Sequence, residues 1–221
     1  MTVVGLCSVL LFCMAVFSCK KKNIAHGLLE KELTDIIRGV AIFMILIHHA
    51  ETNLYEELPH IFSCFIPVGA FGTAIFFFLS GYGNHFSINK IANRGGENWL
   101  FSRIIRLLTS YLIVVVIYTL ILFCLKDEML LTKEYWWNIT MITIPPFTSW
   151  YIKIQILAYL IHFVSYKLKQ EIKGTVLLLM IYTLVAAFMK VDDFWWTSPL
   201  CYGIGIVFAK YKEKAQRMLS K

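Results

Sequence analysis

One arginine and one histidine in a single apolar stretch are the residues of this sequence best suited to chemistry. Arg38 and His49 are eleven positions apart in the run from Leu33 to Ala50. In an α-helix, at about 100° and about 1.5 Å per residue, this spacing returns to within roughly 20° of the same face, about 16 Å along the axis. An imidazole can take a proton from an attacking hydroxyl and return it to a leaving group. A guanidinium can hold a phosphate or a developing oxyanion, so the pair is suited to acyl transfer.

The neighbours of this pair are compatible with more than one role. Asp35, three residues before Arg38, is close enough on a helix to orient the guanidinium. Arg38 could instead extend its charge to the aqueous interface, and the paired His48 and His49 could be solvated at a helix end. An ion or proton relay between Arg38 and His49, in a small transporter or a membrane scaffold, is the second class of function that these residues would suit.

The composition indicates the surroundings of these side chains. The 221 residues are 58% hydrophobic and 16% charged, and the mean hydropathy is +0.67, which is more apolar than one soluble core requires. Stretches near the length that spans a bilayer, about 20 apolar residues, recur along the chain. We therefore predict an all-α fold, a polytopic integral membrane helical bundle with about seven transmembrane helices, over Val3–Phe17, Ile36–Ala50, Ile61–Tyr82, Leu107–Leu125, Trp150–Tyr166, Thr175–Met189 and Phe194–Ala209.

The basic residues predict the orientation of these helices. They gather in the connectors at 18–35, 83–106, 167–174 and 210–221, all on one side, and the alternate connectors hold only Lys126, Lys133 and Lys190. By the positive-inside rule the first side is cytoplasmic, which predicts a multi-pass protein of the cell's inner (plasma) membrane. Because the net charge of +7 comes from residues at helix ends, we expect no nucleic-acid partner.

Two regions are expected along the chain. Residues 1–22 form an amino-terminal membrane helix or a signal-like segment; no Lys or Arg precedes the apolar run, which favours an uncleaved helix. Residues 33–215 form the membrane domain. The six cysteines show neither CxxC spacing nor the density of a disulfide scaffold, so we expect no metal site.

Four sequence blocks, taken in order, are similar to a known family. The first joins Asp35, Arg38 and Gly39 to His49, and the second is the phenylalanine-rich run 72–82, which ends in Ser-Gly-Tyr. The third is the Arg-x-x-Arg of residues 103–106, ahead of a tyrosine at 111, and the fourth is a tryptophan at 150 followed nine residues later by a tyrosine. Together they resemble the membrane-bound acyltransferase family 3, the O-acyltransferases that modify cell-surface sugars and lipids. Thr109 stands where the family usually has Pro, and Ala74 where many members have Asp. The roles of that Pro and that Asp in the family are therefore not carried over to this chain.

The resemblance implies an activity and a site. It implies transfer of an acyl group, acetyl in our expectation, from acyl-CoA to a hydroxyl of a cell-surface polysaccharide or a lipid-linked sugar. His49 would be the general base or transient acyl carrier, and Arg38 would hold charge on the donor. Arg103 and Arg106 would bind the phosphates of acetyl-CoA, although anionic lipid headgroups suit this pair equally well. No permanently bound cofactor is implied.

The resemblance also carries an expectation about the length of the domain. Family members usually have more membrane helices than this sequence offers, and its last segment resembles a helix from the middle of the domain. We therefore expect the carboxy-terminal helices to be missing and a partner to supply them. The alternative is an inactive acyltransferase fragment.

Overall fold

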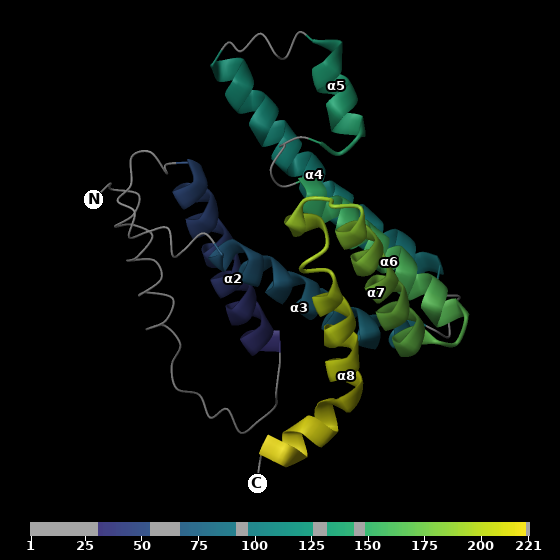
Figure 1. Ribbon diagram of the computed structural model, residues 1–221. Helices are drawn as coiled ribbons and strands as arrows, with labels where there is room; N and C mark the ends of the chain where they lie inside the picture. Colours follow the sequence, from purple (N-terminus) through teal and green to yellow (C-terminus); the bar gives the residue numbers. More distant parts are fainter. Residues whose placement is uncertain (1–30, 54–66, 92–96, 126–131, 144–148, 220–221) are drawn as a thin grey trace. The chain divides into compact units, whose positions relative to one another are not determined.

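The described part of the chain is helical. The computed structural model describes residues 31–53, 67–91, 97–125, 132–143 and 149–219 (Figure 1), and among these residues there is no strand. The all-α prediction is thereby confirmed. The predicted segment Val3–Phe17 and the proposed region 1–22 lie outside the described residues.

Seven α-helices and one short 3₁₀ helix are present in the described ranges. They are α2 (Lys31–Asn53), α3 (Val68–Ile91), α4 (Glu97–Cys124), α5 (Lys133–Thr140), α6 (Ser149–Lys167), α7 (Glu171–Phe188), η5 (Asp193–Trp195) and α8 (Leu200–Leu219). By length and composition, three stretches of the described helices could cross a membrane: Lys31–Ala50, Asn98–Cys124 and Glu171–Phe188. The apolar helices support a membrane protein, while the predicted number of about seven spans is not confirmed.

The boundaries of two predicted segments differ from the helices, for identifiable reasons. The described part of the segment Ile61–Tyr82 becomes helical at Val68, directly after Pro67, a residue that lacks an N–H and suits a helix start. The helix then continues to Ile91, beyond the predicted end, because polar side chains in its last turns find partners in tertiary contacts, as with the buried Asn84. In the segment Phe194–Ala209, Pro199 separates η5 from α8.

The chain divides into two compact units, Met1–His85 with Leu200–Lys221, and Phe86–Pro199. In the first unit, helix α3 packs closely on α2 and on α8. A Cβ placed on Gly72 of α3 would lie 2.7 Å from the Ala41 carbonyl oxygen of α2, and Gly205 of α8 packs on the Phe78 carbonyl of α3. Small residues at these crossings let the helix backbones approach, as is common between membrane helices.

In the second unit, α6 packs along α7 and against α4 (Figure 1). The short helix α5, which the hydrophobic pattern did not predict, is held on α4 by partly buried polar contacts. The Tyr135 hydroxyl lies 2.6 Å from Thr119 Oγ1, and the Tyr111 hydroxyl donates to the Ile139 carbonyl at 2.9 Å. Leu122 and Tyr135 form the buried centre of this contact. Trp136 and Trp137 on the same helix are exposed, as expected of aromatic anchors at a membrane interface.

Candidate active site

Helix α2 carries Arg38 and His49 without interruption between them. Arg38 Nη1 donates to Asp35 Oδ1 at 2.6 Å, so the carboxylate orients the guanidinium as the spacing predicted. Both side chains of this pair are about half exposed, at 47% and 52%. Charge-assisted contacts of this kind have little effect on stability at exposed positions, but they restrict the directions in which the remaining N–H groups point.

The two histidines of α2 have different surroundings. His48 packs on α3, where a Cβ placed on Gly69 would lie 2.7 Å from the His48 Cβ atom. The His49 ring stands next to it, with centroids 5.2 Å apart and planes tilted by 58°, and is partly exposed. His48 therefore contacts α3 directly, and both imidazoles are partly exposed.

The arginines of the third block belong to the second unit and differ from each other. Arg103 is half-buried, and its Nη2 donates to Ser87 Oγ at 2.7 Å. The indole N–H of Trp99 donates to the same oxygen at 2.5 Å. Arg106, one turn further along α4, is exposed. Arg103 is thus held in place by the chain, whereas Arg106 is presented to its surroundings.

Sequence reasoning missed a buried polar group in the second unit. His162 is fully buried in the middle of α6, and its Nε2 lies 3.1 Å from a carboxylate oxygen of Glu171 in the first turn of α7. The Trp99 ring stands edge-on to His162, with centroids 5.4 Å apart. An ionisable residue within an apolar segment was the available signal, since such residues usually face the interior of a helix bundle.

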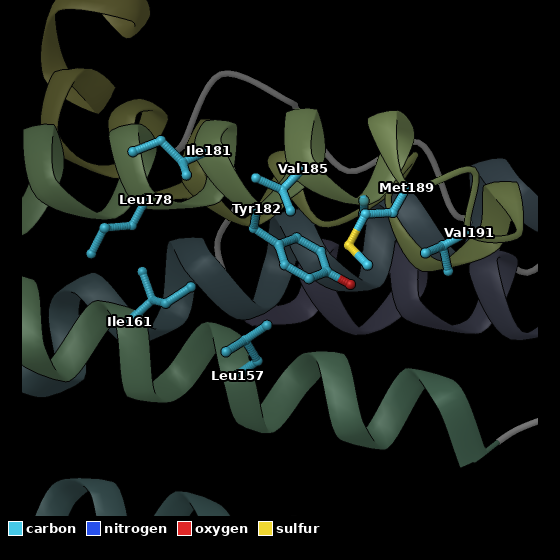
Figure 2. A pocket seen from close by; sticks show the side chains of 9 residues that line it. Leu157, Ile161, Leu178, Ile181, Tyr182, Val185, Met189 and Val191 are labelled. Carbon is cyan, nitrogen blue, oxygen red and sulfur yellow. The ribbon is translucent and has the colours of Figure 1, made fainter.

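Two apolar hollows lie away from these residues. Figure 2 shows an apolar groove of about 400 Å³ in which Leu157 and Ile161 of α6 face residues of α7, with the Tyr182 ring lying across it. The Tyr182 hydroxyl donates to the Trp195 carbonyl. A second hollow in the first unit is also apolar and includes Ala74. None of the four predicted site residues lines either hollow.

The four predicted site residues are divided between the two units. Arg38 and His49 share α2 of the first unit, and Arg103 and Arg106 share α4 of the second. The structure joins Arg38 to Asp35 and Arg103 to Ser87. The two site pairs therefore come from two units, each with its own local contacts.

Comparison with known proteins places the chain in a family. The family model Acyl_transf_3, described as an acyltransferase domain, matches residues 34–221. The match contains all four sequence blocks and every predicted site residue. No curated protein and no solved structure matches the chain. The helical fold and this match define a membrane-associated acyltransferase. The chain belongs to the acyltransferase 3 family.

Proposed function

We propose that this acyltransferase moves an acetyl group from acetyl-CoA to a hydroxyl of a cell-surface glycan or a lipid-linked sugar. It would do so as a multi-pass protein of the inner (plasma) membrane. The observation that carries the proposal is the family match over residues 34–221, together with an uninterrupted α2 that carries a guanidinium oriented by Asp35 and a partly exposed imidazole.

The geometry of α2 favours a long donor. Because the helix is continuous from Lys31 to Asn53, the eleven positions between Arg38 and His49 correspond to about 16 Å. One reacting carbon cannot contact both residues at that separation. Coenzyme A carries its phosphates and its thioester at opposite ends of a flexible arm, so an extended donor suits charge recognition at Arg38 and chemistry at His49.

The proposed reaction needs one group that accepts and returns a proton. The acceptor hydroxyl oxygen attacks the thioester carbonyl carbon while the His49 imidazole takes the hydroxyl proton. A carbon–oxygen bond forms, the carbon–sulfur bond breaks, and the proton passes from His49 to the departing thiolate. The products are an acetyl ester and coenzyme A, and the imidazole is neutral again.

Arg103 and Arg106 are the proposed cationic groups for the donor's phosphates. Two guanidinium groups three residues apart on α4 share a side of that helix and can each donate two N–H groups to phosphate oxygens. The positive-inside rule assigns this end of α4 to the cytoplasm, where acetyl-CoA is available.

The matched variants His49→Gln and His48→Gln test the assignment of His49. Both remove an imidazole from the same turn of α2 and leave a polar side chain. Cells that express the full chain would be supplied with labelled acetate, and label in their envelope glycans would be measured. We expect His49→Gln to reduce acetylation by about 100-fold or more, the range for loss of a general base. His48→Gln should retain most of the label at equal expression.

Two other results would contradict the proposed function of His49 or of the whole chain. Equal labelling by His49→Gln and the unaltered chain would overturn the catalytic assignment. If the unaltered chain added no acetyl label but moved ions or protons across vesicles in a manner dependent on Arg38 and His49, the relay function would replace the proposed one.

A further inference from the structure

Ser87 of α3 joins two donors from α4. Its hydroxyl oxygen accepts from Trp99 Nε1 at 2.5 Å and from Arg103 Nη2 at 2.7 Å. A hydroxyl oxygen has two acceptor positions, and these two contacts occupy both. The Ser87 rotamer is therefore fixed from two directions, and it in turn fixes one N–H group of the Arg103 fork.

The Trp99 indole has little freedom to move. It is only 1% exposed, and its ring meets Tyr159 and His162 of α6 edge-on, with centroids 6.2 and 5.4 Å away. His162 is itself held by Glu171 of α7. A chain of contacts thus runs from the α6–α7 pair through Trp99 and Ser87 to the guanidinium of Arg103.

Such an arrangement does more than stabilise a helix crossing. A long arginine side chain in an open position has many rotamers, and ordering it when an anion binds costs conformational entropy. A guanidinium that the protein already holds in place binds a phosphate without that cost, because the site is preorganised. Arg106 is exposed, and the structure shows no hydrogen bond from its guanidinium within the described ranges, so the two arginines of the block are not equivalent.

We propose that Ser87 is a positioning residue for the donor site, which holds Arg103 ready for a phosphate of the acyl-CoA, with Trp99 fixing the serine. The inference rests on the proposed function, in which Arg103 binds the donor. Ser87 acts on donor affinity through Arg103 and takes no part in the transfer of the acyl group.

The test is a double-mutant cycle on the full chain in lipid nanodiscs, with acetyl-CoA as the varied substrate. The variants are Ser87→Ala, Arg103→Ala and the double variant. Ser102→Ala is the matched control, because Ser102 is exposed on α4 and its hydroxyl donates to the Asn98 carbonyl of its own helix. Affinity for coenzyme A alone would be measured in parallel, which separates binding from turnover.

We expect Ser87→Ala to raise the KM for acetyl-CoA about three- to tenfold, the size expected for loss of one intramolecular hydrogen bond. The kcat should stay within about twofold, and Ser102→Ala should resemble the unaltered chain. In the Arg103→Ala background, loss of the serine should add nothing, because the residue through which it acts is already absent. Trp99→Phe keeps an aromatic ring but removes the N–H, so it should shift KM in the same direction.

Each alternative outcome has a distinct meaning. An unchanged KM in Ser87→Ala with a raised KM in Arg103→Ala would overturn the inference and leave the donor assignment standing. Fully additive effects would overturn it too, because Ser87 would then act independently of Arg103. An unchanged KM in Arg103→Ala would remove the donor assignment itself.

Discussion

Gly81 of α3 and the main-chain carbonyl of Tyr202 in α8 are in such close contact that a Cβ atom on the glycine would overlap the carbonyl. Gly205 of α8 makes the reciprocal contact with the Phe78 carbonyl of α3. One turn beyond Gly81, Asn84 Nδ2 donates to the Tyr202 hydroxyl at 3.0 Å, and both side chains are buried. The glycine of the Ser-Gly-Tyr block is thus explained by helix packing, which also positions α3 for its contact with α2.

This packing predicts a contrast among glycine variants. Gly81→Ala and Gly205→Ala should each lower the free energy of unfolding by about 1–3 kcal/mol, because backbone atoms must move to admit the methyl group. Gly83→Ala is the control, since a Cβ at that position meets nothing within 4 Å. It should be neutral or stabilising by up to about 1 kcal/mol. Thermal unfolding in detergent checks this, and equal effects of all three substitutions would contradict the packing account.

The buried His162–Glu171 pair predicts a specific loss of stability. Glu171→Ala leaves the fully buried imidazole without this carboxylate, and a lost buried partner costs about 1–3 kcal/mol. Glu134→Ala is a matched control, because Glu134 also lies in the first turn of its helix but is exposed. The helix-dipole contribution is then similar in both variants. Equal melting temperatures of the two variants in detergent would contradict a structural role for the pair.

The Asp35–Arg38 contact should affect donor binding but have little effect on stability. Asp35→Asn should change stability by less than about 1 kcal/mol, because both side chains are half exposed. It should nevertheless raise the KM for acetyl-CoA, since the guanidinium is no longer oriented for the donor. Glu32→Gln, one turn earlier on α2, is the control for the change in charge. If both variants keep the unaltered KM, orientation by Asp35 does not contribute to donor binding.

The all-helical fold could be predicted from the sequence because long apolar segments are what a bilayer requires of the helices that cross it. A bilayer requires helices of a certain length, and hydrophobic runs reveal them. The Asp35–Arg38 contact could also be predicted, because residues three apart on a helix are neighbours whatever the tertiary fold. The family was predicted correctly from the order of four short blocks.

The contacts between elements distant in sequence could not be predicted from the sequence. Helix α5 depends on Tyr111 and Thr119 of α4, which no periodicity of its own eight residues indicates. The extension of α3 depends on partners more than ten residues away in sequence, as with Ser87 and Arg103. The donor, the acceptor and the roles of the four predicted site residues remain predictions, since they depend on ligands.

In the proposed reaction, His49 is the group that moves the proton during acyl transfer. The decisive measurement is the rate at which the purified chain, in lipid nanodiscs with an added glycan acceptor, releases coenzyme A from acetyl-CoA. We expect acceptor-dependent release by the unaltered chain and by His48→Gln, and a rate at least about 100-fold lower for His49→Gln with unchanged coenzyme A affinity. Equal release by the His49→Gln and unaltered chains would contradict the account.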